Sequence, residues 1–107
     1  LDLRGAEWVV LSACESGVAG SWNREGSLGL TRAFRLAGAR AVIASQWAVE
    51  DDATCEWMTA LHRARAAGAT AAGDALQQAS REVLRARRSS GRSIHPYYWA
   101  AFTATGD

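Results

Sequence analysis

The sequence has no lysine, one proline, one methionine and only two cysteines among its 107 residues. Cys14 and Cys55 lie far apart and form no CxxC pair, so the sequence indicates neither a disulfide scaffold nor a zinc site. We see neither a signal-peptide pattern nor an apolar run long enough to span a bilayer, so we expect no membrane segment. The expected compartment is therefore the reducing cytoplasm.

The sequence also has no excess of charge of either sign. Twelve basic and 11 acidic residues give a net charge of +1, which provides no bulk attraction for nucleic acid or an anionic membrane. All the basic residues are arginine, which together with the abundant alanine indicates a GC-rich genome. Hydrophobic residues make up 49% of the chain, enough for the core of one domain or part of one. Because the chain starts at Leu1 and soon enters an apolar strand, we expect a piece of a longer polypeptide.

Residues 9–17 form the segment around which the expected fold and site are arranged. Their first half is apolar and β-branched, which predicts a strand buried on both faces. The second half holds Cys14 among small and polar residues, and Gly17 allows a sharp turn. A cysteine just past the carboxyl end of a parallel strand sits where open α/β sheets bind ligands. The alternative is a small buried thiol, because cysteine is among the most buried residue types. A reactive thiol needs an electropositive neighbourhood, which the sequence does not show.

Apolar runs and helical periodicity alternate along the chain and predict an α/β fold. Two buried strands joined by a helix form a crossover that is normally parallel and right-handed. Apolar residues recur at helical spacing in three segments, and Thr70 is a candidate cap. The expected elements are strands at 8–13, 39–47 and 97–104 and helices at 25–37, 50–67 and 70–88; the expected apolar stripes are Leu30, Phe34 and Ala37, then Trp57, Leu61 and Ala64, then Ala72, Leu76, Ala79 and Val83.

Three sequence blocks, at residues 9–17, 25–51 and 95–102, are informative together because of their order and spacing. They read VVLSACESG, then EGSLGL running into AGARAVIASQWAVED, then HPYYWAAF. In this order and spacing they resemble the C-terminal part of a CHAT domain, a caspase-like family related to separase and often found after tetratricopeptide repeats. The resemblance covers nearly the whole chain.

The resemblance implies a caspase-like three-layer sandwich with a mostly parallel sheet, of which residues 1–107 form the C-terminal part. It also implies peptide hydrolysis by a cysteine–histidine dyad, with Cys14 as the nucleophile. The family's histidine lies in an upstream His-Gly segment that this sequence lacks, and neither His62 nor His95 matches its position. Without that base a cysteine is mostly thiol at neutral pH, so we expect these residues alone to be a poor peptidase.

The resemblance further implies a substrate pocket after the second strand, formed by Ser45, Gln46, Trp47, Asp51 and Asp52. In separase-like relatives an acidic residue here favours arginine or lysine before the cut, and Asp51 matches it best. Helix capping is the alternative for both aspartates. Some relatives use an aspartate two positions before the nucleophile for basic specificity, but that position is Ser12 here.

The remaining candidates have plainer interpretations. Cys55 is expected to be a core thiol, and Trp22 to cover the core or to line a cleft. The basic cluster Arg81, Arg85, Arg87, Arg88 and Arg92 lacks stacking aromatics, so we expect a solvated helix end rather than a nucleic-acid site. We expect no cofactor and no metal.

Two functions are consistent with these residues. The first is a cysteine endopeptidase domain that acts on a protein or peptide substrate and is regulated by attached tetratricopeptide repeats or other sensor domains. The second is a non-catalytic protein-interaction module on the same fold. A strand ending in His-Gly upstream of Leu1 would distinguish the peptidase from the module.

Overall fold

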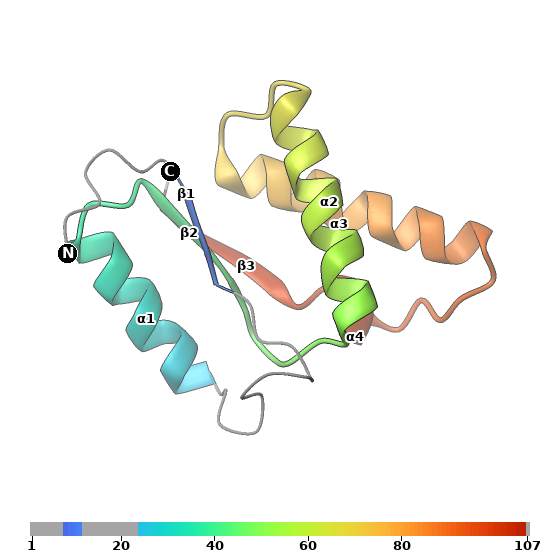
Figure 1. Cartoon of the computed structure of the whole chain (residues 1–107), viewed down its shortest axis with the longest axis horizontal. Helices are drawn as coiled ribbons and strands as arrows, with labels where there is room; N and C mark the ends of the chain where they lie inside the picture. Colours follow the sequence, from blue (N-terminus) through green and yellow to red (C-terminus); the bar gives the residue numbers. More distant parts are fainter. Residues whose placement is uncertain (1–7, 12–23, 107) are drawn as a thin grey trace.

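The computed structural model describes residues 8–11 and 24–106, and the expectations for Ser12, Cys14 and Trp22 lie outside these residues. Helices cover both faces of a small sheet, with α1 on one face and α2 and α3 on the other (Figure 1). The elements in chain order are β1 (Trp8–Leu11), α1 (Arg24–Leu36), β2 (Ala41–Ser45), α2 (Asp51–Ala66), α3 (Ala72–Ser89), α4 (Pro96–Trp99) and β3 (Phe102–Gly106).

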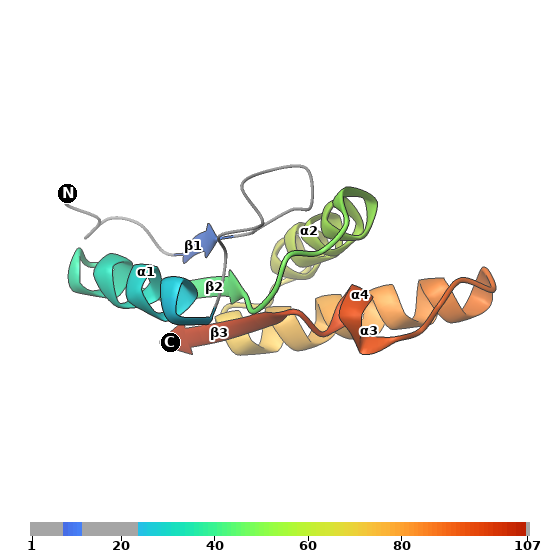
Figure 2. The same ribbon diagram turned by 90° about the horizontal axis from the view of Figure 1, so that it is seen from below.

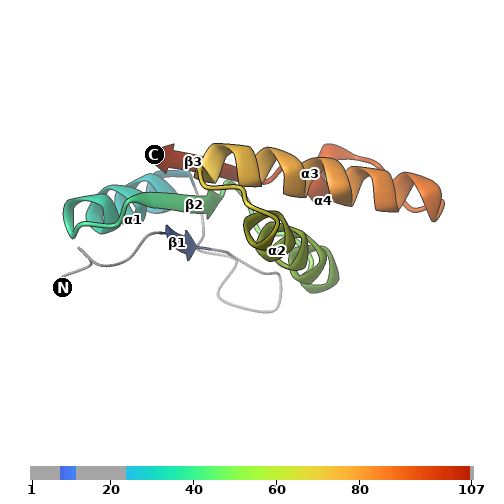
Figure 3. The same ribbon diagram turned by 90° about the horizontal axis from the view of Figure 1, so that it is seen from above.

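The sheet has the order β1-β2-β3, and Figures 2 and 3 show the strands side by side. β1 and β2 are parallel, with Val9 opposite Val42, and α1 joins them, as the sequence predicts. Every residue of β2 is buried. β1 is only half-buried and Val10 is 37% exposed, so the expectation that β1 is buried on both faces is wrong. β1 is an outer strand of the described sheet, which leaves one of its edges without a covering strand there.

β3 pairs with β2 in the antiparallel direction, with Ile43 opposite Ala104, so the sheet is mixed. The strand expected at 97–104 is wrong in its first half, because residues 96–99 form the single turn of α4. Proline suits the first helical position, where its missing N–H would have no partner anyway. His95 is the N-cap, and its Nδ1 accepts a hydrogen bond from the backbone N–H of Tyr97 at 3.1 Å.

α1 and α2 lie within one residue of their expected bounds at either end. Gly38 and Gly68 follow them with φ of 112°, a conformation that glycine adopts without steric cost. The apolar stripe expected on α1 is only partly buried: Leu30 is 42% exposed, whereas Thr31 is buried. α1 packs against β2.

α2 and α3 pack closely because most of the residues between them are alanine. The buried residues Ala60 and Ala64 on α2 and Ala75 and Ala79 on α3 belong to one core cluster. Such small side chains let two helix backbones approach closely. α3 starts later than expected: Ala71 is its N-cap residue and Thr70 does not cap it.

Trp57 on α2 connects the helix pair to the sheet. Its side chain is fully buried and stacks on Phe102 of β3, with ring centroids 3.9 Å apart and an interplanar angle of 14°. Its indole N–H donates a hydrogen bond to Ser80 Oγ on α3 at 3.1 Å. One side chain therefore contacts both the sheet and the second helix of the pair, which fixes the position of α2 over β3.

Candidate functional site

The carboxyl end of β2 holds three of the residues expected to bind substrate. Ser45 is the last residue of the strand and is fully buried. Gln46 is fixed to the segment that holds β3. Its backbone N–H donates to Ala101 O at 2.7 Å, and its Nε2 donates to Thr103 Oγ1 at 2.9 Å. The sheet thus continues its hydrogen bonding one residue beyond β2 and presents a rigid edge.

Trp47 follows on the same edge and is partly buried against the core. Its indole N–H donates to the carbonyl oxygen of Tyr97 in α4 at 3.0 Å. The loop then returns to the core at Val49, which is buried, just before α2 begins. α4 therefore supports the turn between β2 and α2, and Trp47 is held between them.

Asp51 and Asp52 lie in the first turn of α2, and both are exposed. The N-cap residue is Glu50, and no side chain there makes a capping hydrogen bond. Thr54 Oγ1 instead donates to Glu50 O at 3.0 Å. Within residues 8–11 and 24–106, neither aspartate has an ion pair. Their carboxylates interact favourably with the positive end of the helix dipole.

The structure brings Ser45, Gln46 and Trp47 together and sets the two aspartates a short loop away. It also places the carboxyl end of β1 next to that of β2, with Leu11 opposite Ala44. Cys14, the expected nucleophile, lies outside the described residues.

Arg87 contradicts the prediction made for the basic cluster. It was expected on a solvated helix end, yet it is only 5% exposed. Its Nε donates to Ser93 O at 2.6 Å, and its guanidinium lies over the ring of Tyr98, 4.0 Å from the centroid. Arg87 continues the stripe of Ala79 and Val83 at a spacing of four residues, which is the signal in the sequence that could have indicated its burial.

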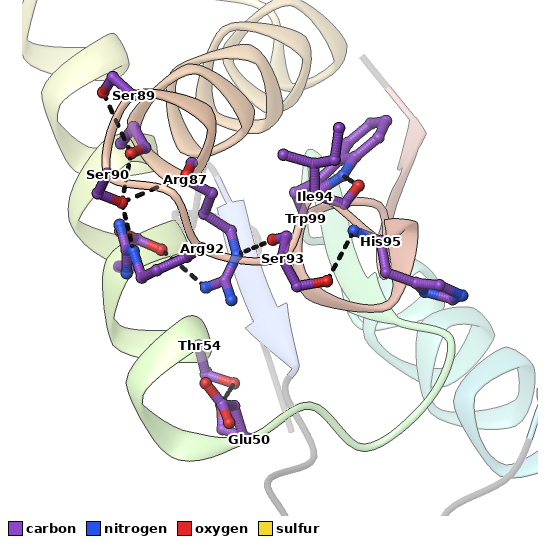
Figure 4. Close-up of polar contacts among 12 residues, drawn as sticks. Glu50, Thr54, Arg87, Ser89, Ser90, Arg92, Ser93, Ile94, His95 and Trp99 are labelled. Carbon is purple, nitrogen blue, oxygen red and sulfur yellow. Dashed lines mark hydrogen bonds and ion pairs between the residues drawn. The ribbon is translucent and has the colours of Figure 1, made fainter.

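Glu56 on α2 completes this cluster. Its Oε1 lies 3.6 Å from Arg87 Nη1, beyond hydrogen-bond distance, and its Oε2 accepts from Arg92 Nη2 at 2.7 Å. The segment after α3 is held by further local bonds, seen in Figure 4 around Ser90, Arg92 and Ser93. The cluster therefore ties α2, the end of α3 and α4 together, and α4 in turn supports Trp47.

The remaining expected residues have other surroundings. Cys55 is exposed, so the expectation of a core thiol is wrong. It faces outward because Ala53, Thr54 and Trp57 occupy the buried side of α2. His62 is exposed on the same helix, and His95 is the N-cap of α4. No three histidine, cysteine or acidic residues cluster as a metal site in the part of the chain that the structure describes.

In the described residues, a three-stranded sheet with helices on both faces defines a mixed α/β fold. Residues 1–107 match the family model of the CHAT domain, so this chain belongs to the CHAT domain family, which is related to caspase-like peptidases. One relative is the mouse protein Tetratricopeptide repeat protein 28, which is 33% identical over 107 residues. The match covers 99% of this chain and 4% of that protein.

No solved structure is significantly similar to the chain. None of the helices in the described residues has the length and apolar character needed to cross a membrane.

Proposed function

We propose that this chain is the C-terminal part of a caspase-like cysteine endopeptidase domain, with Cys14 as its nucleophile and an upstream segment supplying the histidine. Membership of the CHAT family is the observation that carries the proposal. In this reaction the thiolate attacks the carbonyl carbon of the scissile peptide bond. The leaving amine takes a proton from the imidazolium, and water then hydrolyses the thioester and frees the thiol.

The parallel pairing of β1 and β2 supports this place for the nucleophile. Cys14 is three residues after Leu11, and three residues of extended chain span at most about 11 Å. Leu11 lies opposite Ala44, so the proposal puts the thiol near the edge formed by Ser45, Gln46 and Trp47. The ends of neighbouring parallel strands are where α/β sheets bind ligands.

In the proposed site the residues after β2 have distinct roles. Ser45 is buried and holds the strand end in place, so it acts through its neighbours. Gln46 and Trp47 are half-buried and form a rigid wall for the substrate. Asp51, exposed and without an ion pair in the described residues, pairs with an arginine or lysine before the cut, and Asp52 is adjacent to it.

The full-length protein provides the test. It is incubated with a fluorogenic peptide that has arginine before the scissile bond, and Cys14→Ala is compared with Cys55→Ala. Cleavage is expected to disappear in the first variant and to persist in the second. In the wild type, the extent of iodoacetamide labelling of Cys14 is expected to match the extent of activity lost. Cleavage that survives in Cys14→Ala would overturn the assignment.

The runner-up is a non-catalytic protein-interaction module on the same fold. The relative is a tetratricopeptide repeat protein by name, which supports repeat or sensor domains as partners under either function. A full-length sequence without an upstream His-Gly segment, together with no cleavage by the wild type, would favour the module.

A further inference from the structure

An open groove of about 310 Å³ runs between α2 and α3, on a part of the helix pair that the candidate site does not use. Three of its lining residues come from α2, one is the C-cap residue of that helix, and four come from α3. They are Ala60, Arg63, Ala64 and Ala67, and Gln78, Arg81, Glu82 and Arg85. Figure 1 shows α2 crossing α3 in this region.

The side chains that line the groove carry more positive than negative charge, because they include three arginines and one glutamate. Arg63 on α2 is ion-paired with Glu82 on α3 across the groove. Arg81 and Arg85 are exposed, and neither has an ion pair within residues 8–11 and 24–106. These two arginines are four residues apart, so they lie on one side of the helix and repel each other.

The helix dipole accounts for only part of this arrangement. It favours cations within the last turn of a helix and falls off beyond it. Arg81 is about two turns before the end of α3 at Ser89, so the dipole gives no reason for its position. A ligand with carboxylates would relieve the repulsion between Arg81 and Arg85.

The floor of the groove is small and apolar. Ala60 and Ala64 are buried and close the floor of the groove, and the exposed Ala67 beside them offers a methyl group to the apolar atoms of a bound chain. Each arginine guanidinium has a planar fork of donors that matches a carboxylate.

We propose that this groove, lined by Arg63, Arg81 and Arg85, binds an acidic segment of a partner protein. The partner is a polypeptide rather than a nucleic acid for two reasons. None of the groove-lining residues is aromatic, so bases would have no surface on which to stack. The net charge of +1 gives no long-range attraction to a continuous phosphate backbone.

This inference does not depend on the peptidase function, because the groove contains none of the residues proposed for substrate. The test therefore uses the full-length protein with Cys14→Ala as background, which prevents cleavage of the probe. The probe is a fluorescein-labelled helical peptide of glutamate and alanine, and binding is followed by fluorescence anisotropy. A matched peptide with glutamine in place of glutamate controls for charge.

The double variant Arg81→Gln/Arg85→Gln is expected to weaken peptide binding by about tenfold, because it removes two cations that have no ion pair within the described residues. Arg32→Gln on α1, another exposed arginine, is expected to leave binding unchanged. Added salt weakens the wild-type complex toward the level of the double variant.

Three outcomes would overturn the proposal. The first is the absence of binding to the wild type. The second is an equal effect of Arg32→Gln and the double variant. The third is tighter binding of a single-stranded oligonucleotide of matched length than of the glutamate peptide, since that would assign the groove to nucleic acid.

Discussion

Trp57 and Phe102 stack face to face with centroids 3.9 Å apart, although 45 positions separate them in the chain. The pair joins α2 to β3 at the centre of the core. Phe102→Ala removes the ring and leaves a cavity, so we expect a loss of about 3–5 kcal/mol in the free energy of unfolding. Urea denaturation of the complete domain, followed by tryptophan fluorescence, measures it. Leu36→Ala, at a position 80% exposed, is the control and should change stability by less than about 0.5 kcal/mol.

Arg87 and Arg88 are neighbours in α3 with opposite surroundings, which makes them a matched pair. Arg87→Met leaves Ser93 O without its donor and removes the cation over Tyr98, so we expect a loss of about 1–3 kcal/mol. Arg88→Met, at an exposed residue, should be silent within about 0.5 kcal/mol. Thermal unfolding of both variants compares them, and equal midpoints would contradict the buried role of Arg87.

Asp51 distinguishes substrate recognition from helix stabilisation. If its carboxylate pairs with the substrate, Asp51→Asn lowers kcat/KM for peptides with arginine before the cut by orders of magnitude, and affects neutral peptides much less. Asp74 is an exposed residue in the first turn of α3, so Asp74→Asn controls for the loss of an acidic residue near a helix start. Equal activity of wild type and Asp51→Asn on the arginine peptide would leave only the helix-dipole role.

Gly106 is the last residue of β3 and has a φ of 95°. A Cβ there would lie 2.6 Å from both Arg35 Nη1 and Arg40 O, and the latter is a backbone atom. Gly106→Ala is therefore expected to destabilise the domain by more than about 1 kcal/mol. Gly73 in α3 has no atom within 4 Å of its Cβ position, so Gly73→Ala should stabilise by about 0.5–1 kcal/mol. Shifts of the same sign for the two variants in chemical denaturation would contradict this account.

The sequence predicted the β1–α1–β2 crossover and the two long helices, because apolar runs and helical spacing are local signals. It failed where tertiary contacts decide. Residues 97–99 are aromatic and favour a strand by composition, but Pro96 and the His95 cap start a helical turn there. No local pattern predicts that Trp47 will reach Tyr97 O, since 50 positions separate them.

The errors over Arg87 and Cys55 share one cause. Residue type suggested an exposed arginine and a buried cysteine, while helical position placed them the other way round. Ser45, Gln46 and Trp47 could be located from the end of an apolar run. The hydrogen bonds that fix them could not, because they come from Ala101, Thr103 and α4.

The alanines between α2 and α3 have a consequence for how this domain can vary. A methyl group is the smallest side chain with a Cβ, so no shortening is available at Ala75 or Ala79 except to glycine, and any lengthening must separate the helices. Separation at that level would move Ser80 away from Trp57 and Glu56 away from Arg87 together. The spacing between α2 and α3 therefore determines both the packing of the core and the position of the Arg87 cluster that supports α4. A substitution that alters this spacing must be compatible with both.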